Sequence, residues 1–169
     1  MFKHFLSCVR KDDRGVAAVE FALWTTLFFF AVMVALDFGS YYMHRGKLST
    51  AVGAAAVSAY NQPNNVAFNS MQGYVRSLSG FPNATVTNSC NGVAGSCTNL
   101  NRSCACLKND GTFVAAACNT SCSGSGITAG SRAGYYYTIT ASAPFSPMII
   151  PDSVLDGSTL SQRATVRLN

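Results

Sequence analysis

The sequence predicts an α+β protein in which a long N-terminal helix crosses a membrane and extends into a small antiparallel sheet, stabilised by disulfides. Three observations predict this class. An uninterrupted apolar run follows a short charged start. Helical periodicity continues beyond the run, and strand-like alternation follows later. Six of the seven cysteines lie close together in the second half of the chain.

The apolar run, residues 16–36, is long enough to cross a bilayer, and its only charged side chain is Glu20. A helix of this length spans about 30 Å, the thickness of a hydrocarbon core. Only 11% of the chain is charged and 49% is hydrophobic, whereas about a quarter of a soluble domain is charged. We therefore expect a transmembrane helix.

The charges on either side of this run predict its orientation. Lys3, Arg10, Lys11 and Arg14 precede it, and the first basic residue after it is Arg45. The positive-inside rule then places the N-terminus in the cytoplasm and the rest of the chain in an oxidising compartment. A cleaved signal peptide is the alternative, but the run is longer than usual and no small-x-small site closes it.

The cysteines divide into two groups. Cys8 lies before the membrane run, on the predicted cytoplasmic side. The other six can form three disulfides with 15 possible connectivities, among which the sequence does not choose. They are Cys90, Cys97, Cys104, Cys106, Cys118 and Cys122.

Two other uses of these cysteines are less favoured than disulfides. A zinc site is disfavoured because the paired C-x2-C spacing of zinc ligands is missing. Thiol exchange at Cys104 and Cys106 is disfavoured because no C-x-x-C stands at a helix start. We expect structural disulfides and no metal.

One segment carries a family resemblance. It consists of RGVAAVEFA (residues 14–22), the apolar helix, the residues DFG (37–39) and the helical stretch KLSTAVGAAA (47–56). This combination resembles the TadE-like family of bacterial minor pilins and pseudopilins, which belong to the tight-adherence (Flp-type) branch of type IV pilus systems. The resemblance covers residues 14–60, and the C-terminal strands 135–169 also resemble family members.

The resemblance implies a type IV pilin-like fold and a processing step. A prepilin peptidase of the inner membrane would cut between Gly15 and Val16, releasing residues 1–15 as a cytoplasmic leader. Glycine suits an extended backbone in a tight protease site because it has no side chain. The implied location is the bacterial inner membrane, with a single span, a cytoplasmic N-terminus and a periplasmic C-terminal domain that can enter a pilus or pseudopilus. Other pilin or pseudopilin subunits and the pilus assembly machinery are the implied partners, with a role in assembly or cell adhesion.

The implied cut supplies a partner for Glu20. A carboxylate in the membrane is costly when alone. The new amino group on Val16 is largely cationic near neutral pH, so Glu20 of one subunit can pair with Val16 of its neighbour. The alternative is that Glu20 reaches water at the cytoplasmic interface and has no assembly role.

Beyond the membrane, periodicity predicts that the long helix continues to residue 60, with 37–60 as its periplasmic half. The apolar positions that align on one face of this half are Tyr41, Leu48, Val52, Ala55 and Ala59. Pro63 ends it. The Ala/Gly-rich residues 51–56 can pack on the chain's own sheet or on another subunit. Residues 64–78 are expected to form a second, short helix.

The remaining domain, residues 61–169, contains the cysteine-rich region 90–122. Strands are predicted at 84–88, 135–143 and 159–168, and the Asp110-Gly111 pair predicts a hairpin at 108–114. Together they are expected to make one sheet of about four strands packed on the long helix. The Gly/Ser-rich residues 121–131 are expected to form a flexible loop that no disulfide restrains.

The composition argues against an enzyme. The outer region offers only Asp110, Asp152 and Asp156 as carboxylates, and no histidine beyond His44, so acid/base catalysis is hard to assemble. There is no phosphate-binding loop, and no cofactor is expected. The net charge of +5 is not gathered in a basic, aromatic-rich patch, which argues against nucleic-acid binding.

Two rival functions remain open at this point. One is a pseudopilin of a general secretion system, which shares the structural class but serves another client. The other is an uncleaved, membrane-anchored periplasmic binding domain, which would keep residues 1–15.

Overall fold

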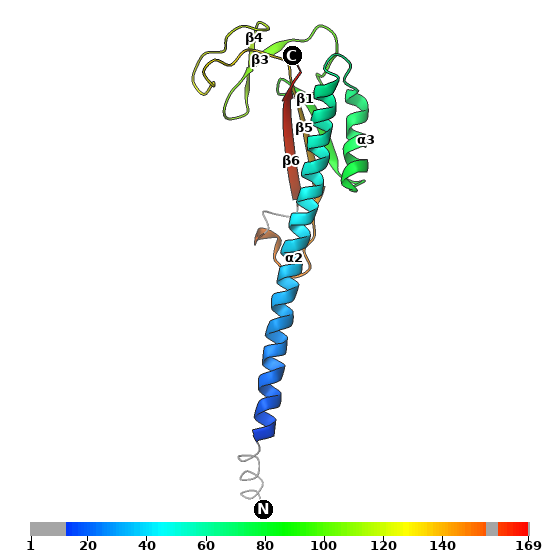
Figure 1. Ribbon diagram of the computed structural model, residues 1–169, viewed down its shortest axis with the longest axis vertical. Helices are drawn as coiled ribbons and strands as arrows, with labels where there is room; N and C mark the ends of the chain where they lie inside the picture. The colour runs from blue at the N-terminus through cyan, green and yellow to red at the C-terminus, as the bar shows by residue number, and fades with distance from the viewer. Residues whose placement is uncertain (1–12, 155–158, 169) are drawn as a thin grey trace, which may run out of the picture.

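The computed structural model describes residues 13–154 and 159–168 (Figure 1). In chain order its elements are α2 (Asp13–Asn61), α3 (Phe68–Ser79), β1 (Thr85–Cys90), β2 (Val93–Ala94), β3 (Cys104–Leu107), β4 (Phe113–Ala116), β5 (Tyr136–Pro144), the 3₁₀ turn η1 (Asp152–Val154) and β6 (Thr159–Arg167). The α+β class is confirmed: a long apolar N-terminal helix leads into antiparallel strands with disulfides.

Helix α2 forms a stalk with two different halves. It has 49 residues, which at 1.5 Å per residue gives a length of about 73 Å. Its N-terminal half stands clear of every other element, and its C-terminal half lies against the sheet and α3 (Figure 1). The expected single helix through the membrane run and beyond is therefore observed, one residue longer at its C-terminal end than predicted.

The main sheet has four antiparallel strands in the order β2-β1-β5-β6. Strand β5 is central: it pairs with β1 on one side and with β6 on the other, where Ile139 stands opposite Asn88 and Ala164. Strands β5 and β6 correspond closely to the predicted strands 135–143 and 159–168. The partner on the far side of β1 is the two-residue strand β2, which the sequence did not predict.

The expected hairpin forms, but it does not join the main sheet. Strands β3 and β4 make a separate two-stranded sheet, with Cys106 opposite Val114. Gly111 has φ of 82°, as the tight turn between them requires. The expectation of a single four-stranded sheet that includes this hairpin was wrong, because the fourth strand is β2 instead.

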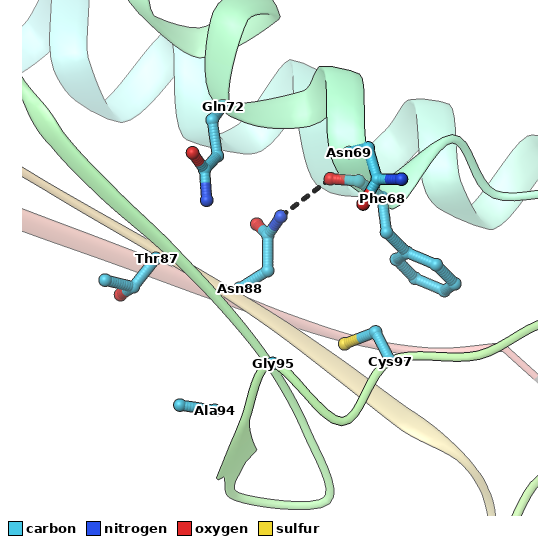
Figure 2. Close-up of a pocket in the computed structure, with 8 residues that line it drawn as sticks. All are labelled: Phe68, Asn69, Gln72, Thr87, Asn88, Ala94, Gly95 and Cys97. Atoms are coloured by element: carbon cyan, nitrogen blue, oxygen red, sulfur yellow. Dashed lines mark hydrogen bonds between the residues drawn. The ribbon is translucent and has the colours of Figure 1, made fainter.

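Helix α3 lies on the sheet and covers part of β1. The Asn88 side chain in β1 donates a hydrogen bond to the backbone carbonyl of Phe68 at 2.8 Å (Figure 2). Met71 and Val75 are buried, and Gly80 ends the helix in the left-handed conformation. Tyr74 and Leu78 on the same helix are 45% and 50% exposed.

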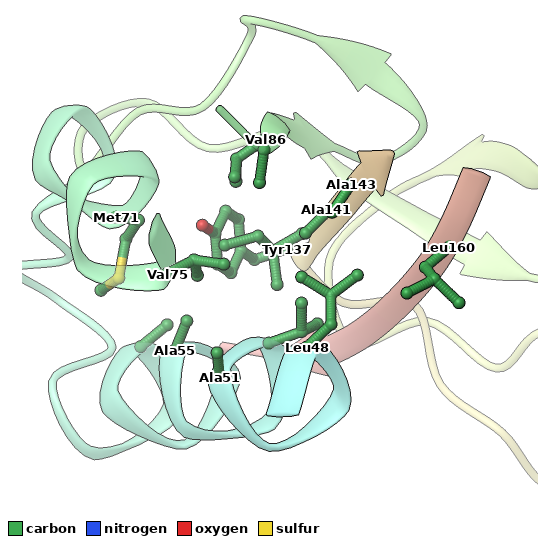
Figure 3. Close-up of a cluster of buried hydrophobic side chains, with 14 of the residues drawn as sticks. Leu48, Ala51, Ala55, Met71, Val75, Val86, Tyr137, Ala141, Ala143 and Leu160 are labelled. Carbon is green, nitrogen blue, oxygen red and sulfur yellow. The ribbon is translucent and has the colours of Figure 1, made fainter. Parts of the chain in front are cut away.

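The main core lies between α2, α3 and the sheet (Figure 3). The predicted apolar face of α2 is confirmed, since Leu48, Val52, Ala55 and Ala59 are almost completely buried. The same burial, with that of Ala51, settles the alternatives for this alanine-rich stretch in favour of packing on the chain's own sheet. Small side chains here allow α2 to approach the sheet closely.

All six outer cysteines are paired in the structure. The disulfides join Cys90 to Cys97, Cys104 to Cys118 and Cys106 to Cys122. Their sulfurs are therefore not free as thiolate ligands for zinc, and Cys104 and Cys106 are not bonded to each other. Cys8 lies outside the described residues.

The second and third disulfides build a small second core under the hairpin. Cys104, Cys106, Cys122 and Ala133 are buried together there. The Gly/Ser-rich loop 121–131 closes over it, and its backbone is bonded at both ends and in the middle: Cys122 N–H donates to Ser131 O at 2.9 Å, and Asn109 N–H donates to Gly126 O at 2.7 Å. The expectation that no disulfide restrains this loop was wrong, because Cys122 lies within it.

Candidate assembly site on the N-terminal helix

The N-terminal half of α2 exposes most of its apolar side chains within the described structure, although Val34 near its end packs against the main core. Among the described residues, this is the one helix that is long and apolar enough to cross a membrane, and none of its most apolar window is buried. Phe21 and Trp24 are 73% and 70% exposed. Apolar surface of this extent normally meets lipid or another protein.

The predicted processing bond lies inside the first turns of this helix. Helix α2 begins at Asp13, before Gly15 and Val16. Gly15 is helical in this structure, whereas the extended backbone expected for it is that of the chain bound in the protease. A Cβ atom built on Gly15 meets no other heavy atom within 4 Å. Packing within the chain therefore does not require a glycine at this position.

Glu20 stands one helical turn after Val16, so both lie on the same side of α2. Its side chain is exposed, and Val16 is 58% exposed. Among the residues whose side chains are described, Glu20 has no hydrogen-bond or ion-pair partner. Among the described side chains, Glu20 is thus an exposed carboxylate without a partner, followed by the apolar run.

The other carboxylate of α2, Asp37, has the opposite environment. It is only 3% exposed although it directly follows the apolar run. Its two oxygens accept three backbone hydrogen bonds from the segment after β5: from Met148 N–H at 2.9 Å, Ile149 N–H at 2.8 Å and Ile150 N–H at 3.0 Å. Three successive amides thus surround one carboxylate.

These bonds favour the charged form of Asp37. The hydrogen bond from Met148 N–H, together with those from Ile149 and Ile150, lowers the pKa of the Asp37 carboxyl below its ordinary value, against the opposing effect of burial. In the sequence, Asp37 only marks the end of the membrane run. Its partners lie more than a hundred residues away, so local patterns carry no signal for this contact.

Aromatic side chains make further contacts between α2 and the segment after β5. The Phe145 ring packs edge-on against Tyr41, with 5.5 Å between ring centroids, and against His44 at 5.7 Å. Asp37, Tyr41 and His44 are spaced by four and three residues, so they share one face of α2. That face, together with Leu48 above it, holds the outer domain on the helix.

The outer domain also has a shallow hollow of about 390 Å³ between α3, β1 and β2. Phe68, Asn69, Gln72 and Asn88 line it together with Cys97 (Figure 2). Its polar groups are amides and a threonine hydroxyl, and Cys97 is held in a disulfide. This hollow offers hydrogen bonds but no acid, base or nucleophile, and within the described residues no group of three or more metal-ligating side chains forms either.

Comparison with known proteins gives one match. The family described as TadE-like protein matches residues 15–57, which include the predicted processing bond, the exposed apolar half of α2 and most of its buried half. No curated protein matches the chain. No solved structure matches it either. Through residues 15–57 the chain is therefore a match to the TadE-like family, as its sequence predicted.

Proposed function

We propose that this protein is a minor pilin or pseudopilin of a tight-adherence (Flp-type) pilus system. In this proposal a prepilin peptidase cuts after Gly15, and the mature subunit is inserted in the inner membrane through residues 16–36. It then takes part in pilus assembly or adhesion by packing with other pilin subunits, as a structural and non-enzymatic component.

The observation that carries the proposal is the match of residues 15–57 to the TadE-like family, on a helix whose most apolar window is not buried by any of the described residues. A bilayer covers such a surface before assembly, and neighbouring helices can cover it afterwards. The outer half of α2 is already occupied by its own sheet and α3. Helix packing between subunits is therefore proposed for the apolar half.

Glu20 is proposed to set the register of that packing. After the cut, the cationic amino group of Val16 on one subunit pairs with the Glu20 carboxylate of the next. Val16 and Glu20 are both exposed on the same side of α2, and Glu20 has no partner among the described side chains. Pairing removes the cost of an isolated charge in lipid, which is on the order of a few kcal/mol.

The experiment that tests the processing step is N-terminal sequencing of the protein purified from membranes of its native host. We expect Val16 as the first residue. Met1 as the first residue would overturn the pilin assignment and favour the uncleaved, membrane-anchored binding domain.

The register role of Glu20 is tested separately by pilus incorporation. Glu20→Gln removes the charge but keeps the size, and Val19→Ala, at a neighbouring position that is 60% exposed, is the matched control. We expect the Gln variant to be processed and inserted normally but to be recovered in sheared pili at least about tenfold less, the effect of losing roughly 1.4 kcal/mol of subunit affinity. Equal recovery of both variants would refute the ion pair and leave Glu20 as an interfacial carboxylate.

A further inference from the structure

The segment between β5 and β6 has apolar side chains at the height where the membrane run ends. Asp37, the first residue after the run 16–36, accepts hydrogen bonds from the amides of Met148, Ile149 and Ile150. These three residues are therefore held beside the outer end of the proposed span. Figure 1 shows the described part of this segment, residues 145–154, at the lower edge of the outer domain, next to the middle of α2.

Three apolar side chains of this segment are exposed. Met148 is 82% exposed, Ile149 is 43% exposed and Val154, in η1, is 60% exposed. Ile150, at 8% exposure, and Phe145, at 7%, are buried against the domain. The exposed side chains thus form an apolar tip on a segment that the Asp37 contacts hold in place. We call Met148, Ile149 and Val154 the apolar tip.

We propose that the apolar tip is a second membrane contact, which dips into the outer surface of the same bilayer that α2 crosses. This inference rests on the proposed membrane span of α2. Its support is continuity: the tip is hydrogen-bonded to the residue at which the apolar surface of α2 ends, so lipid that covers residues 16–36 also reaches the tip. Exposed Tyr42, five residues beyond Asp37 on α2, suits the same interfacial level.

The charges around the tip define what kind of surface it meets. No Lys or Arg occurs between Arg132 and Arg163, and none occurs on α2 between Arg14 and Arg45. No basic side chain therefore lies near the tip in the sequence to attract anionic headgroups. The contact is apolar, so it forms on zwitterionic lipid and does not weaken in salt.

Such a contact also explains why a carboxylate is buried at this place. With three amide donors, Asp37 needs no water and can lie at the level of the interface. Two membrane contacts, the helix and the tip, then fix the tilt of the outer domain relative to the bilayer. With the helix as the single membrane contact, the tilt of the outer domain relative to the bilayer would not be fixed.

The test uses the full-length protein in phosphatidylcholine liposomes. Cys8→Ser removes the thiol outside the three disulfides, and a single cysteine is then introduced as Met148→Cys or Val154→Cys and labelled with an environment-sensitive fluorophore. Val57→Cys is the matched control, because Val57 is 58% exposed but lies twenty residues beyond Asp37, about 30 Å further along α2. Trp24, the single tryptophan of the chain, reports insertion of the span through quenching by brominated lipids.

We expect the probes at positions 148 and 154 to shift to the blue and to be quenched by nitroxide-labelled headgroups, equally at low and high salt, while the probe at 57 is unchanged. Probes at 148 and 154 that behave like the probe at 57, with Trp24 quenched, would overturn the second contact and leave the membrane span intact. Absence of Trp24 quenching would overturn the span, and the contact with it.

Discussion

The carboxylate of Asp37 accepts a hydrogen bond from the backbone N–H of Ile150, which lies 113 residues further along the chain, at 3.0 Å. With the bonds from Met148 and Ile149, it joins α2 to the segment between the two longest strands. This junction lies where the helix leaves its apolar half and meets the outer domain. Among the described residues, it is the polar contact between α2 and the outer domain that lies nearest to the N-terminal half of the helix.

Replacement of Asp37 by asparagine is predicted to loosen this junction. The asparagine side chain keeps one acceptor oxygen but loses the charge and the second acceptor, so part of the amide triplet is left unsatisfied. We expect the thermal unfolding temperature of the outer domain in detergent micelles at pH 7 to fall by several degrees. Asp110→Asn is the control: Asp110 also accepts bonds from Thr112, but only within its own turn, and we expect a smaller change.

The same contact predicts how stability depends on pH. The hydrogen bond from Met148 and its two neighbours lowers the pKa of the Asp37 carboxyl below its ordinary value of 3.8. The stabilisation from the carboxylate is therefore complete above that value and is lost as the pH falls through the lower pKa of the folded protein. Unfolding curves recorded between pH 7 and pH 2 should show a smaller loss of stability in acid for Asp37→Asn than for the wild type. Parallel curves would contradict the assignment.

Local patterns predicted most of the elements but not how they meet. Alternating residues indicated β5 and β6, and spacing along α2 indicated the buried face from Leu48 to Ala59, because both depend on the period of one element. The separate sheet of β3 and β4 could not be predicted in this way, since strand partners are chosen by contacts distant in sequence.

In the candidate site, too, local sequence patterns indicated some residues, whereas the contacts between distant segments were not predicted. Gly15, Val16 and Glu20 were found from sequence because they are adjacent and follow a family pattern. The amides that hold Asp37 were not, because any residue type except proline can supply a backbone N–H. The exposed position of Met148 was equally hidden, since an apolar residue in a sequence is expected inside.

A substitution at Ala55 tests the close approach of α2 to the sheet. Ala55 is 0% exposed, so Ala55→Leu forces extra methylenes into a filled core and is predicted to cost about 1–3 kcal/mol of unfolding free energy. Ser58→Leu makes the corresponding change on the exposed side of α2, where the effect stays within about 0.5 kcal/mol. Urea unfolding of both variants in detergent measures the difference. Similar losses for the two would show that Ala55 does not face the sheet.

The disulfides near the hairpin are predicted to stabilise it independently of the main sheet. Cys106 and Cys122 are 16 residues apart, and closing a loop of this size contributes about 3 kcal/mol in the chain-entropy model. Replacing both by alanine should therefore increase amide hydrogen exchange across residues 104–131. Strands β5 and β6, which belong to the other core, should keep their protection. Loss of protection in both regions would mean that the two cores unfold together.

Gly15→Ala is predicted to slow processing without disturbing the fold. The bond after Gly15 is helical in the structure, so a protease that binds an extended chain must first unwind the start of α2. Glycine makes this unwinding easier by about 1 kcal/mol relative to alanine, and a rate that depends on the unwound population would fall roughly fivefold with alanine.

A new Cβ at position 15 meets nothing within 4 Å, so insertion and unfolding of the outer domain serve as internal controls and should not change. The ratio of precursor to mature protein in pulse-chase labelling measures the rate. Gly39→Ala, another exposed helical glycine whose Cβ would meet nothing, is the matched variant, and equal processing of the two would contradict a role for local unwinding at the cut.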